Sequence, residues 1–72
     1  MKGSEVIAAL ESPGCKARFR RRVFSPLIDL RRTSIRGDFE AALFQNGTRM
    51  PDDFQRLGID LMYDDWEEVL HD

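Results

Sequence analysis

Residues 15–23 alternate between apolar and basic side chains, and this alternation constrains the fold more than any other feature of the chain. A period of two predicts a β-strand with one buried face and one exposed face. The buried positions would be Cys15, Ala17, Phe19 and Val23, and the exposed positions Lys16, Arg18, Arg20 and Arg22. Arg21 interrupts the apolar parity, so we expect a bulge there, or a guanidinium that reaches solvent or a carboxylate.

The core that this strand can join is small. The chain has 72 residues, which predicts a single domain over residues 1–72. Domains of this size usually need support from disulfides, a metal or a partner subunit. One cysteine and one histidine can form neither an internal disulfide nor a Cys/His zinc site. We therefore expect a homo-oligomer, either a dimer or a tetramer, with no metal and no cofactor.

The N-terminal and central segments predict a helix and further strands. A helix is expected at about 4–11, with Ser4 as its N-cap and Pro13-Gly14 beyond its end. Strands are expected at 27–35, 39–45 and 48–50, with Asn46-Gly47 as a hairpin turn. The segment 39–45 could instead form a short helix, because Ala-Ala and Glu favour helix and Asp38 could cap it.

The C-terminal segment predicts a helix and a closing strand. Pro51-Asp52-Asp53 suits a helix start, Gly58 would stop its first turn, and 59–62 would form a second turn. A strand is expected at 66–70. The predicted fold class is therefore α+β, with a small antiparallel sheet, an N-terminal helix and a short helix before the C-terminal strand.

Residues 60–69 read Asp-Leu-Met-Tyr-Asp-Asp-Trp-Glu-Glu-Val and hold the only Trp and the only Tyr of the chain. From the residues alone, Trp66 closes the small core. The stretch also resembles the end of the Thoeris anti-defence proteins of the second type, a small phage and prophage family. That family ends in Asp-hydrophobic-Leu-Ala-x-Asp-Trp-Glu-Val and opens with an amphipathic helix, a Gly and a basic strand. The chain departs from the family at Phe24, where the family has Trp followed by Asn-Gly, and after Pro51, where the family has Trp.

The basic strand is the best candidate for a binding site. The guanidinium group of arginine can donate two parallel hydrogen bonds to phosphate oxygens, and an aromatic ring can stack on a base. The strand therefore suits an anionic nucleotide. The candidate ligand-binding residues are Arg18, Arg20, Arg22, Phe24, Asp65 and Trp66. The resemblance implies that the ligand is a cyclic nucleotide signal of the ADP-ribose type. It also implies sequestration without turnover, in the cytoplasm of a bacterial host cell, by a protein that is not an enzyme.

The charge distribution leaves other functions open. Residues 1–36 carry nine Lys or Arg and three Asp or Glu, whereas residues 37–72 carry two and ten. The halves could pair with each other, or the basic half could bind anions. One alternative is a nucleic-acid-binding module that uses 16–22, although the acidic pI near 5.3 disfavours it. Another is a phage inhibitor that binds a host protein through the acidic half. No apolar run approaches a membrane span.

Overall fold

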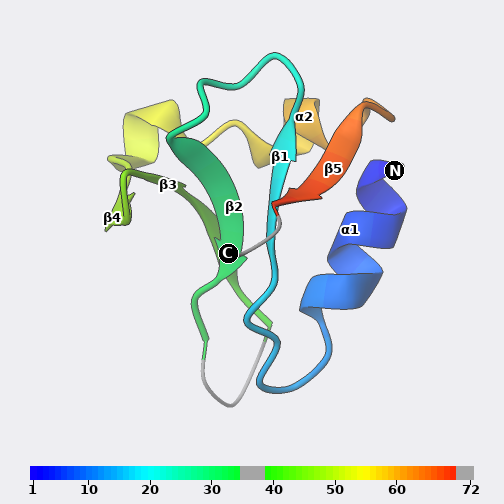
Figure 1. Ribbon diagram of the computed structural model, residues 1–72. Coiled ribbons are helices and arrows are strands. Elements are labelled where there is room, and N and C mark those ends of the chain that lie inside the picture. Colours follow the sequence, from blue (N-terminus) through cyan, green and yellow to red (C-terminus); the bar gives the residue numbers. More distant parts are fainter. Residues whose placement is uncertain (35–38, 70–72) are drawn as a thin grey trace.

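The computed structural model describes residues 1–34 and 39–69 and contains a five-stranded antiparallel sheet with a helix packed on one face (Figure 1). The order of strands across the sheet is β4-β3-β2-β1-β5. This architecture confirms the predicted α+β class. The elements are α1 (Gly3–Leu10), β1 (Arg18–Arg21), β2 (Ile28–Arg32), β3 (Ala41–Gln45), β4 (Thr48–Arg49), the 3-10 turn η1 (Asp52–Phe54), α2 (Leu57–Asp60) and β5 (Trp66–Val69).

Helix α1 begins one residue earlier than predicted. The backbone N–H of Lys2 donates to the Glu5 carboxylate at 2.9 Å, and Lys2 is the N-cap. The predicted cap at Ser4 is wrong, because Ser4 lies inside the first turn. At the other end, the carbonyl oxygen of Leu10 accepts a hydrogen bond from Arg32 Nη1 at 2.8 Å, which ties the helix to β2.

The core lies between α1 and the sheet. Val6 and Leu10 of the helix contact side chains of the central strands, where Phe19 lies opposite Leu30 and Leu30 opposite Leu43. Trp66 is 2% exposed and completes this cluster, so its predicted role in the core is confirmed. The prediction for Val23 is wrong: β1 ends at Arg21, and Val23 is 69% exposed in the following turn.

The hairpin at β3 and β4 is confirmed, and the alternative of a helix at 39–45 is wrong. Gln45 pairs with Thr48, so Asn46 and Gly47 form a two-residue turn. Both have positive φ, 51° and 80°, as a type I′ turn requires. The predicted cap at Asp38 lies outside the described residues.

The helix predicted before the closing strand is present in two short pieces, η1 and α2. Gly58 lies inside α2, so the predicted stop there is wrong. Between the pieces, the Gln55 side chain accepts from the Leu43 N–H at 2.8 Å and donates to the carbonyl oxygens of Leu43 and Met50. The side chain thus occupies the edge of β3 that a neighbouring strand would otherwise use.

Candidate functional site

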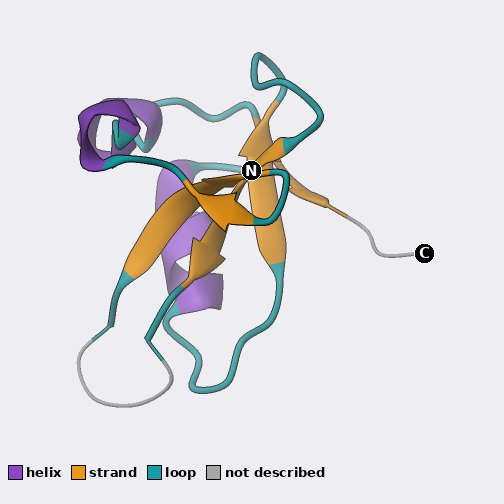
Figure 2. Cartoon of the chain, turned by 90° about the vertical axis from the view of Figure 1, so that its left-hand side faces the viewer, coloured by secondary structure: helices purple, strands orange, loops and turns teal. Residues whose placement is uncertain are grey.

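Strand β1 sends its arginines to both faces of the sheet. Phe19 and Arg21 are buried on the side of α1, whereas Arg18 and Arg20 are half-buried on the opposite side. Among the described residues, no helix covers that opposite side, and Figure 2 shows the strands in front of α1. We call it the arginine face and define it by Arg18 and Arg20 of β1, Asp29 and Arg31 of β2, Phe44 of β3 and Glu67 of β5.

Two arginines of this face lie directly opposite each other. Arg18 pairs with Arg31 in the register of β1 and β2, and like charges in such a position are destabilising. Asp29, which is 5% exposed, offsets the repulsion. Its carboxylate accepts from Arg31 Nε at 2.6 Å and lies 3.8 Å from Arg18 Nη1. The buried carboxylate therefore fixes two guanidinium groups side by side.

A second arginine pair lies at the β5 side of the face. Arg20 lies opposite Glu67 and donates to its carboxylate at 3.3 Å. Arg22, whose side chain is 79% exposed, lies 4.0 Å from the other oxygen of Glu67. Within the described chain, the four arginines Arg18, Arg20, Arg22 and Arg31 thus share the two carboxylates Asp29 and Glu67. Among the residues that the structure describes, this face carries more cations than carboxylates.

Sequence reasoning missed Arg31 and Phe44. The Arg31 guanidinium lies 5.1 Å from the centroid of the Phe44 ring, a distance suited to a cation–π contact. Phe44 is the aromatic side chain that β3 places on the arginine face. The alternation within 27–32 places Asp29 and Arg31 on one parity, but that pattern does not show which strand pairs with β2.

Arg21 is buried on the other side of the sheet and binds two carboxylates. Its Nη1 donates to Asp60 at 2.9 Å, and its Nε donates to Asp65 at 2.8 Å. The guanidinium carbon also lies 3.8 Å from the centroid of the Tyr63 ring. The hydrogen bond between Arg21 and Asp65 raises the pKa of Arg21 and lowers the pKa of Asp65. The expectation that Arg21 finds a carboxylate is confirmed.

The six predicted site residues therefore divide between the two faces. Arg18 and Arg20 lie on the arginine face, with Arg22 at its rim. Phe24, Asp65 and Trp66 lie around Arg21. The Phe24 ring meets the edge of Trp66 at a centroid distance of 5.6 Å, and Trp66 Nε1 donates to the Asp60 carbonyl oxygen at 3.0 Å. The side chains on one face of the sheet thus pack against α1 and α2, whereas the other face carries half-buried cations.

The two oppositely charged halves of the sequence do pair within one subunit. Arg20, Arg21 and Arg22 form ion pairs with carboxylates of the C-terminal half. Arg18 and Arg31 also share Asp29, which belongs to their own half. Pairing between the halves therefore accounts for part of the charge asymmetry.

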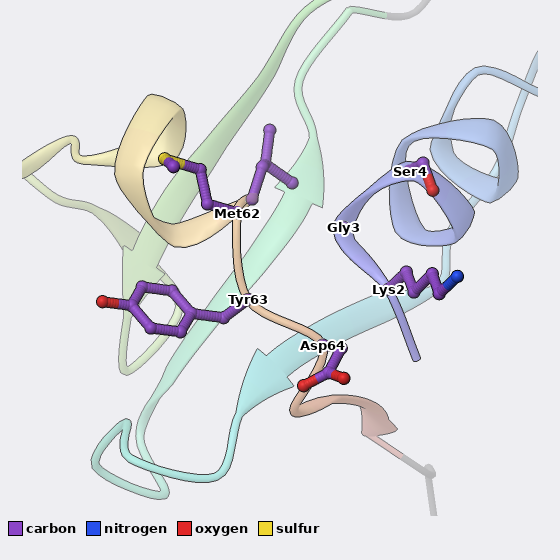
Figure 3. A pocket seen from close by; sticks show the side chains of 7 residues that line it. Lys2, Gly3, Ser4, Met62, Tyr63 and Asp64 are labelled. Carbon is purple, nitrogen blue, oxygen red and sulfur yellow. The ribbon is translucent and has the colours of Figure 1, made fainter.

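Two of the hollows on the surface are lined by described residues. One, of about 500 Å³, lies between the first turn of α1 and the loop after α2 (Figure 3). Its charged side chains, Lys2 and Asp64, have opposite signs, and the Tyr63 ring points away from α1. The other, of about 290 Å³, adjoins the arginine face and is lined in part by Arg18, Asp29 and Arg31. The smaller hollow has the clustered cations that an anionic ligand requires.

Other kinds of site find no support in the parts of the chain that the structure describes. Residues 1–34 and 39–69 contain no group of His, Cys, Asp and Glu side chains that could hold a metal ion. None of the helices in these ranges has the length and apolar character that a membrane span requires. Comparison with protein-family models, curated proteins and solved structures found no match. The arginine face and the sequence pattern at 60–69 are therefore the features of this chain that bear on its function.

Proposed function

We propose that this protein binds a small phosphate-bearing ligand on the arginine face and holds it without turnover. The ligand class is a cyclic nucleotide of the ADP-ribose type, and the protein acts as a cytoplasmic, homo-oligomeric sponge that withholds this signal from a host defence system. One observation carries the proposal: Arg18 and Arg31 lie directly opposite each other on the sheet face that points away from α1, with Arg20 beside them.

The ion pair between Arg20 and Glu67 is of a kind that a ligand can replace. The side chains of Arg20 and Glu67 are 33% and 42% exposed, and pairs of this kind contribute about 0–1 kcal/mol to stability. Phosphate oxygens accept from guanidinium groups bidentately, which a single carboxylate 3.3 Å from one nitrogen does not achieve. A phosphate can therefore displace Glu67 at little cost in free energy.

The buried Asp29 prepares the other two arginines for binding. It engages Nε and Nη2 of Arg31 and thereby orients the guanidinium. A guanidinium has five N–H donors, so this contact leaves donors of Arg31 for a ligand. Since the side chain is already ordered, binding costs less conformational entropy than it would at a mobile surface arginine.

A small ligand suits this surface better than a nucleic acid. Carboxylates are exposed elsewhere on the described surface, among them Asp52, Asp53, Asp64 and Glu68. A long polyanion would cross these charges, whereas a nucleotide with one or two phosphates need not. The resemblance of 60–69 to the second type of Thoeris anti-defence proteins supports a cyclic nucleotide within this class.

The proposal is tested by calorimetric titration with ADP-ribose, a set of cyclic ADP-ribose isomers and a set of cyclic dinucleotides, at low and high salt. We expect tight binding of one cyclic ADP-ribose isomer, and recovery of the intact ligand after the protein is denatured by heat. Recovery of a cleaved product would contradict sequestration. Binding of single-stranded DNA in preference to every nucleotide, with a steep salt dependence, would favour the nucleic-acid alternative.

A further inference from the structure

The hollow of about 290 Å³ beside the arginine face is built by two turns and two strands. Pro26 and Leu27, which precede β2, form one wall, and Asn46 and Gly47 of the β3–β4 turn form another. The backbone N–H of Asn46 donates to the carbonyl oxygen of Leu27 at 2.8 Å, which holds the two turns together. Arg18, Asp29 and Arg31 complete the lining.

These walls offer three different kinds of contact. Leu27 is 55% exposed and, with Pro26, supplies apolar surface on which a flat ring can lie. The Asn46 side chain carries a donor and an acceptor, the pair that matches N7 and the N6 amino group of adenine. Arg18 and Arg31 supply cations at the remaining side. An apolar wall, an amide and a cation pair together suit a nucleotide.

We infer that this hollow is the adenine subsite of the ligand, with Asn46 as the residue that reads the base. This inference rests on the proposed function, and it adds the base specificity and the orientation of the ligand. The adenine lies against Pro26 and Leu27, and the adjoining phosphate lies beside Arg18 and Arg31 and accepts from the donors that Asp29 leaves free on Arg31. Pockets for drug-sized ligands have volumes of about 300–1,000 Å³, so a hollow of about 290 Å³ suits one base rather than the whole nucleotide.

The position of Asn46 allows a test that spares the fold. Asn46 has a φ of 51°, in the left-handed region that glycine adopts without strain. Asn46→Gly therefore removes the amide and keeps the turn. Thr48→Ala is the matched control, because Thr48 is exposed in the same hairpin and is not part of the lining of the hollow. Circular dichroism and thermal unfolding check whether both variants keep the fold.

The experiment measures affinity for three probes: a cyclic ADP-ribose isomer with a free adenine amino group, its hypoxanthine counterpart, and inorganic pyrophosphate. We expect the unsubstituted protein to prefer adenine over hypoxanthine by about tenfold. Asn46→Gly should lose that preference and leave the affinity for pyrophosphate unchanged, and Thr48→Ala should change neither. This pattern would establish both the subsite and the role of Asn46.

Two failures are distinguishable. If the unsubstituted protein binds the nucleotide but Asn46→Gly keeps the full preference for adenine, the adenine subsite is elsewhere and only this inference is overturned. Equal affinity of the unsubstituted protein for the adenine nucleotide and its hypoxanthine counterpart would likewise overturn only this inference. If the unsubstituted protein binds neither the nucleotides nor pyrophosphate, the arginine face is not a phosphate site, and both the proposed function and this inference are overturned.

Discussion

Arg21 Nη1 donates to Asp60 Oδ1 at 2.9 Å across a separation of 39 residues, and this buried ion pair joins β1 to α2. Arg21 and Asp60 are 9% and 8% exposed. The same guanidinium binds Asp65, which precedes β5. One arginine thus fixes the segment 60–65 against the sheet, in a domain whose apolar core is small.

The first prediction concerns the removal of this cation. Arg21→Met should lower the free energy of unfolding by about 3–5 kcal/mol, because the buried Asp60 carboxylate loses its partner. Arg20→Met, in the same strand but at a half-exposed ion pair, should cost less than about 1 kcal/mol. Urea denaturation of both variants measures the difference. Equal losses would show that Arg21 has no special role.

The second prediction concerns the pH dependence of stability. The pKa of Asp65 is lowered in the folded protein by its hydrogen bond with Arg21, so Asp65 stabilises the fold at pH values above its unfolded-state pKa of about 3.9. This contribution is lost as the pH falls from there through the lower folded-state pKa. The unsubstituted protein should therefore be more stable than Asp65→Asn at neutral pH, and the difference should disappear in acid. Urea midpoints measured over the acidic range test this, and parallel pH profiles for the two proteins would contradict it.

The third prediction compares two glycines. A Cβ at Gly3 would lie 2.1 Å from the backbone oxygen of Leu61, so Gly3→Ala must displace α1 or the loop after α2. We expect a loss of about 1–3 kcal/mol. Gly58 lies inside α2 with nothing within 4 Å of its Cβ position, so Gly58→Ala should stabilise by about 0.4–1 kcal/mol. Thermal unfolding distinguishes the two, and a stable Gly3→Ala protein would argue against the close approach of α1 and Leu61.

The fourth prediction is oligomerisation. The chain leaves large apolar side chains exposed on its C-terminal half, with Phe54 at 58%, Ile59 at 56% and Met62 at 83%. A small domain with such residues commonly buries them against another subunit. Light scattering at micromolar concentration should therefore give the mass of a dimer or a tetramer, and Met62→Asp should shift it toward the monomer. A monomer at all concentrations would contradict this part of the proposed function.

Much of the fold could be predicted from local patterns. The alternation at 15–23 predicts β1, and Asn46-Gly47 predicts the hairpin because both residues tolerate positive φ. Two wrong predictions, for Val23 and Gly58, also have physical reasons. Val23 follows the apolar parity of a strand that ends two residues earlier, and Gly58 is accommodated within α2 although it is a poor helix former.

The candidate site was predicted in part, because a site on a sheet face depends on which strands are neighbours. Arg18 and Arg20 follow from the alternation of one strand. Arg31 and Phe44 join them only through the pairing of β2 with β1 and β3, which no local pattern contains. The aromatic character of Phe24 and Trp66 favours a role in stacking on a ligand, but in the fold both side chains pack in or against the core.

The most direct test of the arginine face is calorimetric titration of one double variant with the cyclic ADP-ribose isomer that binds most tightly. Arg20→Gln combined with Arg22→Gln removes the half-exposed cation of Arg20 and the exposed cation of Arg22 without uncovering the core. Arg56→Gln is the control, because Arg56 is exposed and lies between η1 and α2. We predict that the double variant stays folded and loses affinity by at least about tenfold, whereas the control binds as before. Full affinity in the folded double variant would contradict binding at the part of the arginine face that Arg20 and Arg22 form.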